Sequence, residues 1–90
     1  MDGVVLVIED EQNIANLVRI ALERDGYRAP IARTGEEGLA YLSRSPADLV
    51  ILDLGLPGID GLEVCRRIRA SSDVAIIMLT ARDDETDRVV

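Results

Sequence analysis

Three carboxylates directly follow two apolar runs, in an arrangement suited to holding a hard cation. Asp53 follows residues 49–52, and Glu9 and Asp10 follow residues 4–8. Runs this short and this apolar predict buried strands, and open α/β sheets place ligand sites at the carboxyl ends of their strands. If the two strands are neighbours, the three acidic groups converge, and without a cation each would favour its protonated form. We therefore interpret the cluster as a hard-cation site built around one reactive aspartate, Asp53.

The residue types at these positions suit phosphoryl chemistry. Mg²⁺ prefers oxygen ligands and usually takes only a few from the protein. An aspartate beside it can attack a phosphorus atom to give an aspartyl phosphate, while the cation neutralises the charge between nucleophile and phosphoryl oxygens. Thr80 follows a further apolar run, residues 74–79. Its hydroxyl, together with backbone N–H groups of the loops, could bond the remaining phosphoryl oxygens.

Each of these residues also has an ordinary structural explanation. A single aspartate after a strand is usually a turn or cap residue, and Thr80 alone could cap a helix. Glu9, Asp10 and Glu11 could be a solvated acidic helix start. The recurrence of polar groups at several strand ends favours the site over these explanations. Asp60 is expected to be a turn residue and not a ligand.

Strand-like and helix-like segments alternate along the chain. Apolar runs predict strands, and apolar residues spaced three and four apart predict helices. Pro30 indicates that the second strand lies at an edge of the sheet. The expected strands cover residues 4–8, 28–32, 48–53 and 74–79, and the expected helices cover residues 11–25, 34–43 and 61–70, with residues 83–90 forming the first turns of another helix. This alternation predicts one α/β domain over residues 1–90, a doubly wound parallel sheet with helices on both faces.

The apolar positions of two helices predict which side chains face inward. In the first helix these are Ile14, Leu17, Val18, Ala21 and Leu22. In the third they are Leu62, Cys65 and Ile68. Thr34, with Glu37 three residues later, predicts a capping box at the start of the second helix.

Composition narrows the classes of partner. The net charge is −7, and all ten basic residues are arginine, with no lysine and no histidine. We therefore expect no direct contact with nucleic acid. No apolar stretch approaches the length of a membrane span, and the amino terminus has no signal-peptide pattern, so we expect a cytoplasmic protein without a membrane partner.

Four motifs in register make the chain resemble the receiver domain of two-component response regulators. They are residues 7–11 (VIEDE), 48–54 (DLVILDL), 56–61 (LPGIDG) and 76–81 (IIMLTA). The Glu-Asp-Glu form of the acidic group is most similar to the winged-helix transcription-factor subfamily. The resemblance implies a flavodoxin-like fold with strand order 2-1-3-4.

The resemblance also implies roles for individual residues. Asp53 matches the phosphoacceptor, and Glu9 and Asp10 match the acidic pair that holds Mg²⁺, with Asp10 the direct ligand and Glu9 acting through water. The backbone carbonyl of Gly55 matches a further metal ligand, and Thr80 matches the switch hydroxyl. Ala81 leaves room for the phosphate, and Pro57 and Gly61 shape the loop.

The chain departs from the family pattern at its carboxyl end. The family's lysine after the fifth strand and its switch aromatic are not among these 90 residues. We therefore expect a receiver domain that lacks the last strand and helix and stops after the start of the fourth helix. Its fourth strand would then form an open edge, which predicts self-association, with a homodimer as one outcome.

The resemblance implies two-component signal transduction. A sensor histidine kinase would transfer a phosphoryl group to Asp53, and the change would switch a DNA-binding output domain or another partner. The domain would be regulatory and not an enzyme in its own right. The alternative is a fragment or pseudo-receiver that binds partners, or itself, without phosphorylation. A phosphohydrolase is disfavoured, because such enzymes usually place a second aspartate where this chain has Gly55.

Overall fold

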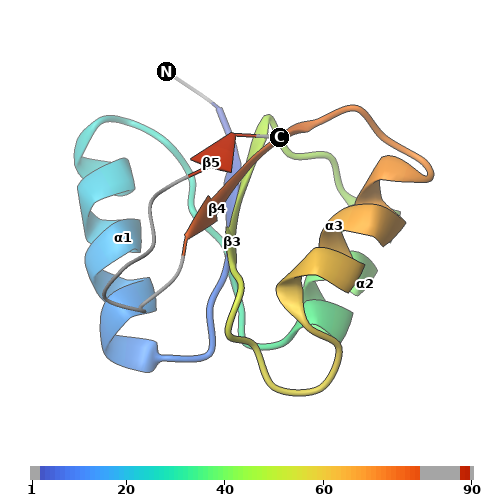
Figure 1. Ribbon diagram of the computed structural model, residues 1–90. Coiled ribbons are helices and arrows are strands. Elements are labelled where there is room, and N and C mark those ends of the chain that lie inside the picture. The colour runs from blue at the N-terminus through green and yellow to red at the C-terminus, as the bar shows by residue number, and fades with distance from the viewer. Residues whose placement is uncertain (1–2, 80–87, 90) are drawn as a thin grey trace.

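A five-stranded sheet with helices on both faces forms the molecule (Figure 1). The computed structural model describes residues 3–79, 88 and 89. Its elements are β1 (Val5–Ile8), α1 (Gln12–Arg24), β2 (Ile31–Ala32), α2 (Gly35–Arg44), β3 (Leu49–Asp53), α3 (Gly61–Arg69), β4 (Ala75–Leu79) and β5 (Arg88–Val89). The strand order is β2-β1-β3-β4-β5, and the first four strands are parallel. The predicted order 2-1-3-4 is confirmed, and β2 lies at the edge that Pro30 indicated.

The fifth strand corrects one prediction. Arg88 and Val89 form a short strand antiparallel to β4, opposite Met78 and Ile77. The expected helix over residues 83–90 is therefore wrong at these two residues, and the edge of β4 is not open at Ile77 and Met78. The backbone groups of Arg88 and Val89 pair with the edge of β4. Residues in a helix would use these backbone groups within the helix and could not pair with a strand edge. The rest of that expected helix lies outside the described residues.

The main core lies on the sheet face that α2 and α3 cover, and α1 lies on the opposite face (Figure 1). Alternate strand residues point to this core. Its buried strand members are Leu6, Ile8, Ala32, Val50, Leu52, Ile76 and Met78. From α3 it receives Val64, Ile68 and the chain's single cysteine, Cys65, which is buried as expected.

Three of the predicted inward positions, Leu17, Ala21 and Leu62, are wrong. Leu17 of α1 is 67% exposed and Leu62 of α3 is 65% exposed. In α3 the buried positions are Gly61, Val64, Cys65 and Ile68. Their spacing of three, four and seven residues defines a face that Leu62, about 100° further round from Gly61, does not share. In α1 only Ala15 is buried, and Ala21 is exposed.

The helices on the main core face begin with side-chain caps. The Thr34 hydroxyl accepts a hydrogen bond from Glu37 N–H (3.0 Å), as predicted. The returning bond runs from Arg33 N–H to the Glu37 carboxylate (2.8 Å), one residue earlier than in an ideal capping box. In α3, Asp60 accepts a hydrogen bond from Glu63 N–H (2.9 Å). The N-cap residue of α1, Glu11, makes no such side-chain bond.

Candidate metal centre

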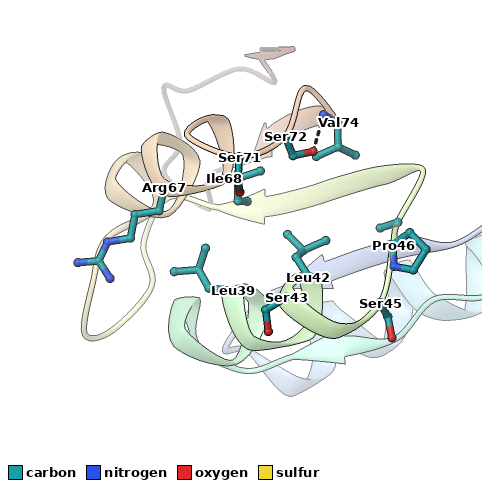
Figure 2. A pocket seen from close by; sticks show the side chains of 11 residues that line it. Leu39, Leu42, Ser43, Ser45, Pro46, Arg67, Ile68, Ser71, Ser72 and Val74 are labelled. Atoms are coloured by element: carbon teal, nitrogen blue, oxygen red, sulfur yellow. Dashed lines mark hydrogen bonds between the residues drawn. The ribbon is translucent and has the colours of Figure 1, made fainter.

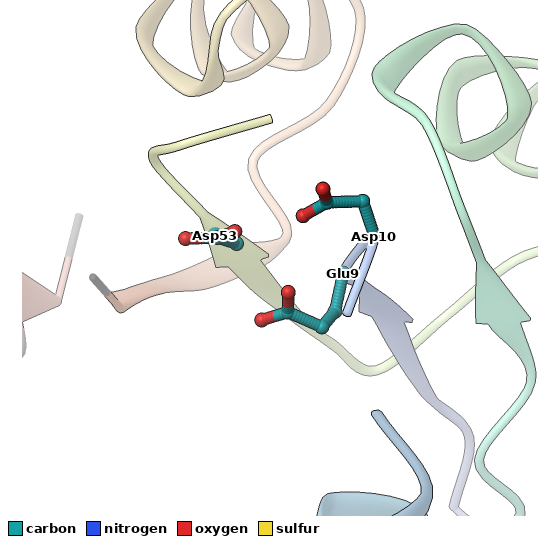
Figure 3. A group of neighbouring side chains, drawn as sticks. All are labelled: Glu9, Asp10 and Asp53. Atoms are coloured by element: carbon teal, nitrogen blue, oxygen red, sulfur yellow. The ribbon is translucent and has the colours of Figure 1, made fainter. Parts of the chain in front are cut away.

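The three predicted carboxylates converge at the carboxyl edge of the sheet. Glu9 and Asp10 follow β1, and Asp53 is the last residue of β3 (Figure 3). The two strands pair directly, with Ile8 opposite Leu52. One carboxylate oxygen from each of the three residues lies within 4.8 Å of the others. The expectation that neighbouring strands bring these groups together is confirmed.

Backbone N–H groups fix two of the carboxylates. Glu9 Oε2 accepts a hydrogen bond from Glu11 N–H at 3.0 Å, just before α1 begins. Asp53 Oδ1 accepts one from Gly55 N–H at 3.1 Å. Each bond uses one oxygen and leaves the second oxygen of that carboxylate available for another partner.

Glu9 and Asp53 are both buried residues, each with 7% of its surface exposed. Burial is the main cause that raises the pKa of Glu9 to about 7. The Glu11 N–H opposes this rise, while the neighbouring Asp53 and Asp10 reinforce it. A proton, or a cation in its place, therefore relieves the repulsion in this cluster.

The donor set fits a small divalent cation such as Mg²⁺. Ligand oxygens on one octahedral Mg²⁺ lie about 2.9 Å apart when adjacent and about 4.1 Å apart when opposite, given metal–oxygen distances of about 2.05 Å. A spread of up to 4.8 Å between oxygens is only slightly wider than this. Small side-chain rotations, or one ligand bound through water, would close the difference. Asp10 is half-buried and faces the other two carboxylates (Figure 3), so it can serve as a direct ligand.

The structure describes some of the other residues that the sequence analysis considered for the site. Gly55 lies beside Asp53, and the contact it makes is the N–H bond already described. Asp60 caps α3 and is not part of the acidic cluster, in line with its expected turn role. Thr80 and Ala81 lie outside the described residues. The residue before Thr80, Leu79, is paired with Asp53, and its carbonyl accepts a hydrogen bond from Leu54 N–H (2.9 Å).

A close backbone approach supports the loop between β3 and α3. A Cβ atom on Gly61 would lie 2.8 Å from the carbonyl oxygen of Asp53. Only glycine therefore allows α3 to begin directly against the end of β3. Gly58 has a φ of +76°, which favours glycine in this turn. The sequence marked both glycines as loop residues, but the distance to Asp53 depends on tertiary packing.

A separate pocket lies at the other end of the sheet. It is lined by the last turns of α2 and α3 and the segments that follow them, including Leu42, Ile68 and Val74 (Figure 2). The Arg67 side chain extends away from the other lining residues in this view, and Arg67 bonds Glu63 at 2.8 Å. No carboxylate lines this pocket, so we assign it no part in the metal centre.

An open, mainly parallel sheet with an acidic cluster at its carboxyl edge is the arrangement that the resemblance to receiver domains implied. The family model described as "Response regulator receiver domain" matches residues 5–90. The chain belongs to the response regulator receiver domain family. Such domains are regulatory modules, and relatives and solved structures extend this assignment.

Two curated relatives are similar over nearly the whole chain. "Sensory transduction protein RegX3" of Mycolicibacterium smegmatis is 46% identical over 86 residues, covering 96% of this chain and 38% of that protein. "Transcriptional regulatory protein AfsQ1" of Streptomyces coelicolor is 49% identical over the same length and the same shares. The chain thus spans about two fifths of the length of the relatives it matches.

Two solved structures share the fold. The response regulator protein TrrA from Thermotoga maritima, in complex with Mg²⁺-BeF, is 44% identical with a TM-score of 0.85, covering 90% of this chain and 71% of that chain. A complex of histidine kinase ThkA with TrrA matches at 41% identity and a TM-score of 0.83, covering 93% and 75%. Among the described residues, no helix is long and apolar enough to cross a membrane.

Proposed function

We propose that Asp53 accepts a phosphoryl group from a sensor histidine kinase in a Mg²⁺-dependent reaction, and that this switches an output domain or partner. The observation that carries the proposal is the convergence of Glu9, Asp10 and Asp53 within 4.8 Å. The Mg²⁺-BeF complex of TrrA and the kinase complex of the same protein support it by similarity.

The chain's own groups suggest how the transfer proceeds. The Gly55 N–H holds Asp53 Oδ1, which leaves the other oxygen to attack phosphorus. A new oxygen–phosphorus bond forms, and the bond to the donor atom breaks with its electron pair leaving on the donor. Bound Mg²⁺ would neutralise the charge shared between the acidic cluster and the phosphoryl oxygens. We propose Asp10 as a direct ligand, with Glu9 through water and the Gly55 carbonyl as further ligands, and Thr80 as the switch hydroxyl.

We propose that the domain acts in the cytoplasm, in a two-component signalling pathway. The names of the relatives favour a transcriptional, DNA-binding output outside these residues. With 17 acidic and 10 basic residues, this segment is not itself suited to contact nucleic acid. Self-association remains a prediction; among the described residues, β5 pairs with Ile77 and Met78 of β4.

Mass spectrometry after incubation with a small phosphodonor tests the proposal. We expect the wild-type chain to gain one phosphate only when Mg²⁺ is present, and Asp53→Asn to gain none. Asp60→Asn is the matched control, because Asp60 is also an aspartate beside this loop but lies outside the cluster. An unmodified wild-type chain, with Mg²⁺ present, would instead favour a module that binds partners without phosphorylation.

Substitutions at Asp53 and Asp60 also test which aspartate binds Mg²⁺. Asp53→Ala should weaken Mg²⁺ binding by about tenfold or more, because removal of one carboxylate leaves too few ligands, whereas Asp60→Ala should leave it unchanged. Amide chemical shifts in a Mg²⁺ titration measure both affinities. Equal effects of the two substitutions would contradict the proposed ligand set.

A further inference from the structure

Helix α2 lies unusually close to the end of β1, and Gly38 makes this possible. A Cβ atom at Gly38 would lie 2.4 Å from Ile8 Cδ1 and 2.9 Å from Ile8 Cγ1. Carbon atoms in non-bonded contact normally stay about 3.5–4.0 Å apart. Glycine is otherwise one of the least favourable residues inside a helix. Its presence in the second turn of α2 therefore matches a need for close packing.

The residue that Gly38 contacts is enclosed by the core and by two neighbouring strands. Ile8 is the last residue of β1 and is fully buried, with 0% of its surface exposed. Its backbone is paired on both sides, with Ala32 of β2 and with Leu52 of β3. Glu9 follows directly, and its N–H is bonded to the Ala32 carbonyl (2.9 Å). A shift of the Ile8 backbone would therefore also move the acidic pair.

The first turn of α2 contacts the other half of the metal centre. A Cβ atom at Gly35 would lie 2.9 Å from Ile59 Cγ1, in the loop that follows Asp53, and 2.4 Å from Val64 Cγ2 in α3. Helix α2 therefore rests at one point against the strand that presents Glu9 and at another against the loop that follows Asp53.

We propose that Gly38 is a positioning residue of the metal centre. Its missing side chain sets how closely α2 approaches β1, and this holds the acidic pair and Asp53 in mutual register. A methyl group at Gly38 must first displace the end of the buried Ile8 side chain. The proposal requires that this shift passes on to the end of β1, which moves Glu9 and Asp10, or to α2, which loosens the packing around Ile59. Because Mg²⁺ demands near-ideal octahedral geometry, either movement weakens metal binding. The inference rests on the proposed Mg²⁺-dependent function.

Mg²⁺ titrations followed by amide chemical shifts test the inference, with thermal unfolding measured in parallel. Gly38→Ala should bind Mg²⁺ about tenfold more weakly, in the range typical of lost support around metal ligands. Ala40→Gly is the matched control, because Ala40 is exposed on the same helix. That control should lower the unfolding temperature through poorer helix propensity while leaving the Mg²⁺ affinity unchanged.

A rescue variant separates positioning from general destabilisation. Ile8→Val removes Cδ1, the nearer of the two atoms that the new methyl group would meet, and keeps the Cγ1 position at 2.9 Å. Gly38→Ala with Ile8→Val should therefore recover most of the lost affinity. If Gly38→Ala does not fold, the double variant decides. A folded double variant with affinity within about threefold of wild type supports the inference, and one still tenfold weaker overturns it.

The failures of the two proposals are distinguishable. Wild-type affinity in Gly38→Ala, or a tenfold loss in Ala40→Gly, would overturn the positioning role alone. Failure of the wild-type chain itself to bind Mg²⁺ would overturn the proposed function and the positioning role with it.

Discussion

The two faces of the sheet differ in how completely their side chains are buried. On one face, α2 and α3 cover a continuous aliphatic core in which Leu6, Leu52 and Ile76 are completely buried. On the other face, α1 buries only Ala15 of its own residues, and Leu17 and Ile20 remain 67% and 46% exposed. The acidic cluster lies between the two, since α1 begins beside Glu9 whereas α2 and α3 support the loop after Asp53. Among the described residues, the α2/α3 face thus buries more large aliphatic side chains than the α1 face.

The largest expected effect comes from making the same Ile→Ala substitution in α3 and in α1 and comparing the losses in the free energy of unfolding. Ile68→Ala removes a side chain that is 2% exposed in α3, and should lower the free energy of unfolding by about 2–5 kcal/mol. Ile20→Ala removes one that is 46% exposed in α1, and should cost less than about 1 kcal/mol. Urea denaturation measures both values. Equal losses would mean that α1 contributes as much to the core as α3.

The acidic cluster should make stability depend on pH. The pKa of Glu9 rises from 4.5 to about 7 in the folded chain, so the folded state holds this proton more tightly than the unfolded state. Without divalent cations, the contribution of Glu9 to stability should be fully present below about pH 4.5 and be lost as the pH rises through about 7, by about 3 kcal/mol in total.

Urea denaturation at pH 5 and pH 7.5, with a chelator present, measures this change. Glu9→Gln should remove most of it, and Mg²⁺ should restore stability at the higher pH by replacing the proton. Glu9 accepts a hydrogen bond from the N–H group of Glu11, which directly precedes α1. The experiment therefore also shows how much the charge of Glu9 affects the stability of the start of α1. Stability in Glu9→Gln that still falls with rising pH would point to another titrating group.

The helix caps should give the smallest contrast. Asp60→Ala and Thr34→Ala each remove a side-chain hydrogen bond at a helix start on the α2/α3 face, and should each cost about 1 kcal/mol. Glu11→Ala should change the free energy of unfolding by less than about 0.5 kcal/mol, because the Glu11 side chain makes no cap bond in α1. Thermal unfolding of the three variants side by side provides the measurement. A loss of about 1 kcal/mol in Glu11→Ala would show that α1 has a side-chain cap after all.

The sequence was sufficient for the features that repeat locally. Short apolar runs separated by amphipathic segments predicted four parallel strands, and the positions of Glu9, Asp10 and Asp53 at strand ends predicted their convergence. The cap at Thr34 was equally readable, because its partner is only three residues away.

Features that depend on distances between elements were not readable. Periodicity identified an apolar side of α1 but not how much of it a neighbour covers, so the burial predicted for Leu17 was wrong. The close contact of Gly38 with Ile8 joins residues 30 positions apart and depends on the depth of helix packing. Likewise, the two-residue strand at Arg88 is set by its pairing with β4, because a segment so short has no pattern of its own.

Cys65 gives the molecule an internal reporter. It is the only thiol in the chain, and its side chain is buried between α3 and the sheet with 7% of its surface exposed. A thiol reagent should reach it mainly when the α3 side opens, and at reagent concentrations where closing outpaces labelling the labelling rate reports the population of that opened state. Detachment of α1 alone would leave the rate unchanged. Local opening of the α3 side can therefore be followed through a native side chain, without engineering a cysteine into the protein.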